Sequence, residues 1–177
     1  MTAPMQARVR RAEPGEAAAV AALAARTFPL ACPPTLPREH VAAFVATHLS
    51  EAEFDRHLAD PAHRVLVVDG PGGPVGYALV LHGAHDEGPE ALRGAPSAYL
   101  SKLYVDPDHH GGGVARALLD AVRADAAGLP VWLGVNADNA RAKRFYAKSG
   151  FVTAGVREFT VGGTTFPIKN TESYRYA

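Results

Sequence analysis

Several features that define other classes of protein are missing from this sequence. It has a single cysteine, Cys32, which excludes an internal disulfide and fits a reducing compartment. Lys plus Arg and Asp plus Glu each number 18, so no overall basic surplus indicates nucleic-acid binding. The opening "MTAPMQARVRRAEPG" has no apolar signal core, and no run of the sequence reaches transmembrane length. We therefore expect a cytoplasmic protein that binds neither nucleic acid nor a membrane.

What the sequence does contain fits one globular domain. Its 177 residues are 47% hydrophobic and 20% charged, which is ordinary for a folded domain with a core of its own. No repeat, linker or low-complexity stretch divides it. We expect a single domain over residues 1–177.

Strand-like and helix-like segments intermix along the chain. Strands are predicted at 7–12, 63–69, 74–82, 98–105 and 130–136, followed by a terminal hairpin over 151–177. Helices are predicted at 13–28, 38–49, 50–60, 114–126 and 139–149. The prolines of "PLACPPTLP" (29–37) are expected to end the first helix. Because several strand pairs are hairpins, the predicted fold class is α/β of the mixed α+β kind, with a mixed sheet.

Three consecutive glycines stand between a predicted strand and a predicted helix in "DPDHHGGGVARALL" (106–119). Backbone N–H groups and the helix dipole favour a phosphate at such a junction, and the missing side chains let it come close. The following Val-Ala replaces the Lys-Ser or Lys-Thr of a P-loop, and the context is not that of a dinucleotide fold. On the glycines alone, a phosphate site and a plain tight turn are equally open.

Two longer stretches resemble the GNAT family of acyl-CoA N-acetyltransferases. "HGGGVA" (110–115), which follows "LYVDP" (103–107), is similar to that family's Q/R-x-x-G-x-G/A pyrophosphate loop. "NADNARAKRFYAKSGF" (136–151) resembles its Asn-x-x-Ala-x-x-Phe-Tyr-x-Lys-x-Gly-Phe pattern. The resemblance implies the GNAT fold, a central mixed and mostly antiparallel sheet of about seven strands flanked by helices. It also implies acetyl-CoA as the cosubstrate.

The same resemblance implies roles for individual residues. The pantetheine arm would meet backbone groups around Leu103, Tyr104 and Val105, and the Leu103 N–H would donate to the oxyanion. Tyr146 would be the general acid for the leaving thiolate, although a plain core position for it stays open. The remaining cofactor-binding residues implied are His110, Gly111, Gly112, Gly113, Val114, Ala115, Asn139 and Ala142. No metal site is expected, because the adjacent His109 and His110 have no evident third ligand.

The sequence departs from the family pattern at two positions. His110 stands where Gln or Arg usually opens the loop, and Ser101 stands where a Glu often precedes Leu-x-Val. The usual candidate base is therefore missing, and a water chain is as good a hypothesis as any side chain. The side chains considered as bases are Glu39, His40, His85, Asp86 and Glu87. Lys148 and Arg144 are weighed as contacts to CoA phosphates or as an exposed helix face.

The acceptor is implied by a narrower resemblance. "TFPLACPP" (27–34), the helical stretch after it and "VWLGVN" (131–136) resemble bacterial polyamine (spermidine/spermine-type) N-acetyltransferases, which implies a small-molecule primary amine. Carboxylates should then line the cleft, with Asp86, Glu87, Glu90, Glu51, Glu53 and Asp55 as candidates. A protein N-terminus, a peptide lysine, an amino acid, an antibiotic amine and a non-catalytic CoA-binding module stay open. The terminal hairpin, Phe159 to Tyr174, offers an edge for a homodimer.

Overall fold

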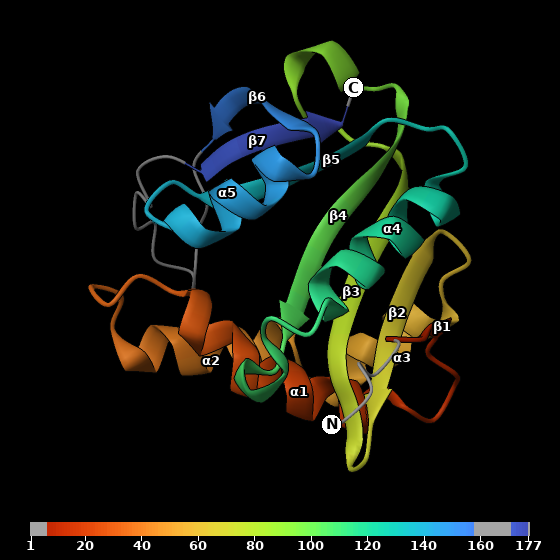
Figure 1. Cartoon of the computed structure of the whole chain (residues 1–177), viewed down its shortest axis with the longest axis vertical. Helices are drawn as coiled ribbons and strands as arrows, with labels where there is room; N and C mark the ends of the chain where they lie inside the picture. Colours follow the sequence, from red (N-terminus) through yellow and green to blue (C-terminus); the bar gives the residue numbers. More distant parts are fainter. Residues whose placement is uncertain (1–6, 158–170, 177) are drawn as a thin grey trace.

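A mixed sheet forms the centre of the molecule (Figure 1). The computed structural model describes residues 7–157 and 171–176. The strands are β1 (Val9–Arg11), β2 (His63–Gly70), β3 (Gly73–Ala84), β4 (Pro96–Val105), β5 (Val131–Asn136), β6 (Phe151–Arg157) and β7 (Thr171–Tyr176). They lie in the order β1-β2-β3-β4-β5-β7-β6, and each neighbouring pair is antiparallel except β4–β5. The expectation of a mixed, mostly antiparallel sheet is confirmed.

Helices cover both faces of this sheet. They are α1 (Ala17–Ala31), α2 (Arg38–His48), α3 (Glu51–Ala59), α4 (Val114–Ala126) and α5 (Ala140–Lys148), with short 3-10 helices at Glu90–Leu92 and Pro107–His109. Buried residues of α1, α2 and α3 form one hydrophobic cluster with the sheet, and those of α4 and α5 form another on the opposite face. Among the described residues, no helix has the length and apolar character needed to span a membrane.

The sequence pattern explains how the two faces are separated. Successive residues of a strand point to opposite faces, so Leu66 of β2 packs on the side of α4 while Val65 packs on the side of α1. In α4, Val114, Leu118 and Val122 recur every four residues, and all three are at most 3% exposed. The glycine loop is thereby held at the sheet surface by the helix that follows it.

One local expectation needs correction. Helix α1 continues to Ala31 with Pro29 inside it, because a proline in the last turn removes only a single backbone donor. The pairing expected of the terminal hairpin is confirmed, because β6 and β7 are antiparallel neighbours; β7 lies between β5 and β6, so β6 forms the edge of the sheet. Such long-range pairing leaves no mark in the local sequence pattern. The turn at 162–163 and Phe159 lie outside the described residues.

Strands β4 and β5 pair over a short stretch and then separate (Figure 1). Their registered pairs are Ala98 with Val131 and Tyr99 with Trp132, and the rings of the second pair stack at 4.0 Å between centroids. Immediately afterwards, the register between β4 and β3 shifts, which leaves Ser101 without a partner on β3. An extra residue of this kind bends a strand and increases its twist. We attribute the divergence of β4 from β5 to this bulge.

Helix α4 packs so closely on β3 that Gly76 has no room for a side chain. A Cβ on Gly76 would lie 2.7 Å from Cγ1 of Val114 and 3.2 Å from Cδ1 of Leu118. Gly76→Ala should therefore lower the free energy of unfolding by ~1–3 kcal/mol through overpacking, as measured by urea denaturation. Gly72→Ala is the matched control, since its Cβ would meet nothing within 4 Å. Equal stability of the two variants would contradict this packing.

Candidate active site

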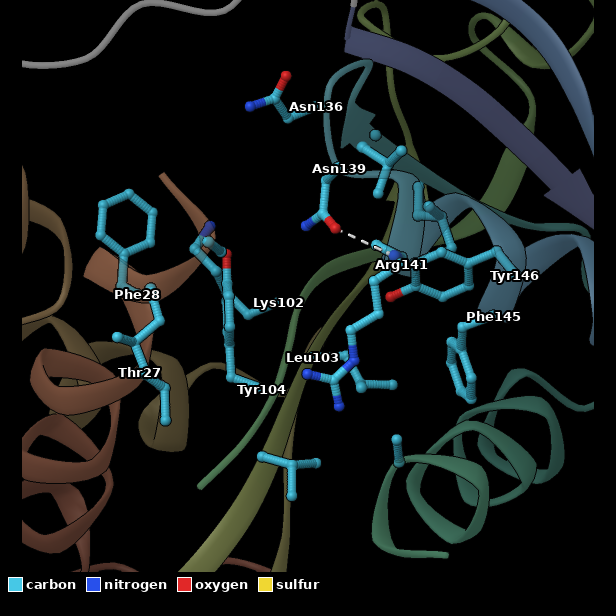
Figure 2. Close-up of a pocket in the computed structure, with 18 of the residues that line it drawn as sticks. Thr27, Phe28, Lys102, Leu103, Tyr104, Asn136, Asn139, Arg141, Phe145 and Tyr146 are labelled. Atoms are coloured by element: carbon cyan, nitrogen blue, oxygen red, sulfur yellow. Dashed lines mark hydrogen bonds between the residues drawn. The ribbon is translucent and has the colours of Figure 1, made fainter. Parts of the chain in front are cut away.

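The split between β4 and β5 opens into a cavity of about 400 Å³ (Figure 2). Its lining comes from the end of α1 and the connection to α2, from residues 99–105 of β4, from residues 133–136 of β5, and from α5. Of the predicted site residues, the lining includes Leu103, Tyr104, Val105, His110, Ala115, Asn139, Ala142 and Tyr146. Gly111, Gly112, Gly113 and Val114 are not part of this lining. They form the turn beside it and the start of α4.

The backbone of β4 faces the split at alternate residues. The N–H of Asp106 donates to the carbonyl of Val75 at 2.8 Å, which fixes the alternation of the β3–β4 ladder. The N–H and C=O groups of Tyr104 consequently face β3, whereas those of Leu103 and Val105 face away from it. A backbone contact from Leu103 or Val105 into the split is therefore available. The backbone of Tyr104 is directed to β3, so only its side chain serves the cavity.

His110 fastens the glycine loop to the strand before it. Its Nε2 lies 2.9 Å from the carbonyl oxygen of Val105. A carbonyl only accepts hydrogen bonds, so Nε2 carries the proton and donates. The histidine that replaces the usual Gln or Arg thus directs this nitrogen to the backbone rather than to a ligand.

The glycine loop presents open donors. Gly111 and Gly113 both have φ of +80°, the left-handed region that glycine adopts without strain. No side chain caps α4 at Gly113, and the N–H groups of residues 111–116 have no acceptor within the described part of the chain. Unpaired donors at a helix N-terminus, next to the positive end of its dipole, suit an anionic group. This observation fits the pyrophosphate role implied by the sequence.

Helix α5 brings a phenol to the cavity. Asn139 is the N-cap, and its Oδ1 accepts from the N–H of Ala142 at 3.0 Å, drawn as a dashed line in Figure 2. Tyr146 is 7% exposed and packs against Phe145 and Phe151, while its hydroxyl points toward the cleft in Figure 2. Burial raises the pKa of Tyr146 above its usual value, so the phenol keeps its proton at neutral pH.

A second phenol lies on the opposite side. The side chain of Tyr104 lines the cavity and meets the ring of Phe28 of α1 edge-on, with 6.3 Å between centroids. Burial, reinforced by the neighbouring Tyr146, Cys32 and Tyr99, raises the pKa of Tyr104. It is therefore a neutral hydrogen-bonding group. Sequence reasoning gave this residue a backbone role only, because the face it points to depends on the bulge at Ser101.

The wall formed by α1 and the following connection is mostly apolar. It consists of Thr27, Phe28, Leu30, Ala31, Cys32, Pro33 and Leu36, which includes most of the "TFPLACPP" stretch. Burial raises the pKa of the Cys32 thiol to about 11, so this thiol is a poor nucleophile at neutral pH.

No acidic residue lines the cavity in the part of the chain that the structure describes. The carboxylates expected there for a polyamine are absent from the lining, namely Asp86, Glu87, Glu90, Glu51, Glu53 and Asp55. The side chains considered as bases, Glu39, His40, His85, Asp86 and Glu87, are absent from it as well. They lie on surface segments whose position relative to the split depends on tertiary packing.

Arg144 and Lys148 of α5 are exposed and do not line the cavity, which agrees with the exposed helix face weighed for them. Arg141 of the same helix, which was not considered, does line it. Residues three, four and seven apart share one face of a helix, so the helical period alone does not separate Arg141 from Arg144 and Lys148.

Comparison with known proteins identifies the class of the molecule. The model of the acetyltransferase (GNAT) family matches residues 22–151. An uncharacterised N-acetyltransferase of Mycobacterium tuberculosis is 48% identical over 146 residues, which are 81% of this chain and 87% of that protein. The chain belongs to the acetyltransferase (GNAT) family. An N-alpha-acetyltransferase of the same organism is 35% identical over 107 residues, 60% of this chain and 63% of the relative.

The fold agrees with solved GNAT structures. The PaiA N-acetyltransferase of Thermoplasma acidophilum, in complex with coenzyme A, superposes with a TM-score of 0.75 over 97% of this chain and 99% of that one, at 14% identity. This GNAT protein is thus an N-acetyltransferase that uses acetyl-CoA. A purely regulatory CoA-binding module is set aside. The backbone N–H groups of the glycine loop and of β4 that lack a described acceptor are suited to binding acetyl-CoA.

Proposed function

We propose that this GNAT enzyme acetylates a primary amine by direct attack within the split between β4 and β5. One observation carries the proposal: the open backbone of Leu103, the hydroxyl of Tyr146 and the residues next to the glycine loop converge on one cavity. Acetyl-CoA supplies an acetyl thioester when bound. The chain's own groups then bind it, stabilise charge and hold a proton.

Each group has a separate task. The N–H groups of residues 111–115 would bind the diphosphate, and the N–H of Leu103 would donate to the thioester oxygen, where negative charge develops. The amine nitrogen forms a bond to the carbonyl carbon as the carbon–sulfur bond breaks. Tyr146, kept neutral by its raised pKa, would give its proton to the leaving sulfur. The nitrogen then loses its extra proton to solvent, from which the phenolate of Tyr146 is reprotonated.

The amine must first lose a proton, because an aliphatic ammonium has a pKa of ~10. Because no carboxylate belongs to the described lining, we propose that water entering the cavity removes this proton. The neutral hydroxyl of Tyr104 faces the acceptor side and would accept a hydrogen bond from the amine. Tyr104 would thus orient the nucleophile without removing its proton.

The lining favours an acceptor whose amine stands beside apolar groups. Phe28, Leu30 and Leu36 offer apolar surface, and the absence of described carboxylates gives no attraction for a polycation. The amino terminus of a peptide with apolar side chains has this chemistry, and the similarity to an N-alpha-acetyltransferase supports it. A polyamine, implied by the sequence resemblance, is the second candidate, because "TFPLACPP" also lines the cavity.

Removing the phenol hydroxyl of Tyr146 should separate chemistry from binding. We expect Tyr146→Phe to lower turnover at least ~10-fold, since the leaving thiolate loses its proton donor, with nearly unchanged affinity for acetyl-CoA. Release of free thiol measures the former and calorimetric titration the latter.

Tyr77→Phe is the control for this variant. Tyr77 is fully buried outside the cavity lining, and its hydroxyl has no hydrogen-bond partner in the described structure, so its loss should leave turnover unchanged. Equal turnover of Tyr146→Phe and the unaltered enzyme would remove Tyr146 from the reaction.

The acceptor class is tested with a panel of amines. We expect kcat/KM for a peptide with an apolar amino terminus to exceed that for spermidine at neutral pH. Leu30→Glu should shift this preference toward spermidine by ~10-fold, because it adds a carboxylate to the cavity wall at a side chain that is 67% exposed. Leu129→Glu adds the same charge away from the cavity and should shift nothing. A higher kcat/KM for spermidine than for the peptide in the unaltered enzyme would make a polyamine, rather than a peptide amino terminus, the favoured acceptor.

A further inference from the structure

Arg141 is a cation in a place that its own helix disfavours. It is the second residue of α5, directly after the N-cap Asn139 and Ala140. The positive end of the helix dipole lies in this turn, and the turn contains no acidic residue that would compensate. Stabilisation of the helix therefore does not explain an arginine here.

Ion pairing does not explain Arg141 either. Other arginines of the fold hold carboxylates, as Arg10 does with Glu16 at 2.8 Å and Arg116 with Asp120 at 3.1 Å. Among the side chains that the structure describes, those of residues 7–157, no such partner is found for Arg141. Instead its side chain lines the cavity together with Leu103, and Figure 2 shows it extending from α5 into the split.

The guanidinium shares this space with the open end of α4. His110 and Ala115, at either end of the glycine loop, line the same cavity as Arg141. The N–H groups of residues 111–116 have no described acceptor, and no described lining residue is acidic. A planar guanidinium and a row of backbone donors around one cavity are complementary to an anion with several oxygens.

We propose that Arg141 binds the diphosphate of acetyl-CoA from the side of α5, across the cavity from the glycine loop. This inference rests on the proposed function, because it requires the diphosphate to lie at that loop. The two negatively charged phosphates are then contacted by α4 and by α5. The diphosphate thereby links the helices that follow the two diverging strands.

The test compares Arg141→Met with Arg144→Met, which removes the same charge from the same helix outside the cavity lining. Calorimetry measures Kd for acetyl-CoA, for dephospho-acetyl-CoA, which keeps the diphosphate, and for S-acetylpantetheine, which lacks it. We expect Arg141→Met to raise Kd for acetyl-CoA and for dephospho-acetyl-CoA by ~10-fold or more and to leave Kd for S-acetylpantetheine unchanged. Arg144→Met should change none of the three. Thermal unfolding should show Arg141→Met to be no less stable, since it removes a cation from the first turn.

Three outcomes would overturn the proposal. The first is unchanged acetyl-CoA affinity in Arg141→Met. The second is a loss for acetyl-CoA but not for the dephospho form, which would assign Arg141 to the 3′-phosphate. The third is an equal loss for S-acetylpantetheine, which would indicate a general distortion of the cavity. Failure of the unaltered protein to bind acetyl-CoA would contradict the proposed function instead, and titrating that protein first separates the two.

Discussion

The short parallel pairing between β4 and β5 is the constraint on which the rest of the site depends. Tyr99 and Trp132 stack at its last pair, and the bulge at Ser101 then turns β4 away. If the two strands paired along their full length, the backbone groups of Leu103 and Val105 would form hydrogen bonds to β5. Because the strands diverge, the backbone groups of Leu103, the N–H of Val105 and the cavity between the strands remain for a ligand, while the Val105 carbonyl is taken by His110.

Because the strands diverge, the two sides of the cavity carry different kinds of groups. The helices that follow β4 and β5 bring the glycine loop, Tyr146 and Arg141, which are donors of hydrogen bonds or protons. The end of α1 brings an apolar wall, against which the ring of Tyr104 packs. An anionic, extended acyl donor suits the first side, and an amine carried by apolar groups suits the second.

The sequence allowed the elements and the two helix junctions to be predicted, because these depend on local pattern. Glycines before Val114 and a capping side chain at Asn139 act within a few residues, and the two helices begin at or next to the predicted residues 114 and 139. The bulge at Ser101 and the insertion of β7 between β5 and β6 arise from pairing between distant segments, which a single sequence does not display. For the same reason, the carboxylates proposed to attract a polyamine are absent from the described lining, and Arg141, which lines the cavity, was not singled out.

The most direct test of the account is residue-resolved amide hydrogen exchange with and without acetyl-CoA. Added acetyl-CoA should slow exchange at Leu103, Val105 and residues 111–116, whose N–H groups face the split or lack a described acceptor. The N–H of Tyr104 should change little, because it faces β3 in the free protein. Binding of acetyl-CoA that leaves exchange at Leu103, Val105 and the glycine loop unaltered would contradict the account.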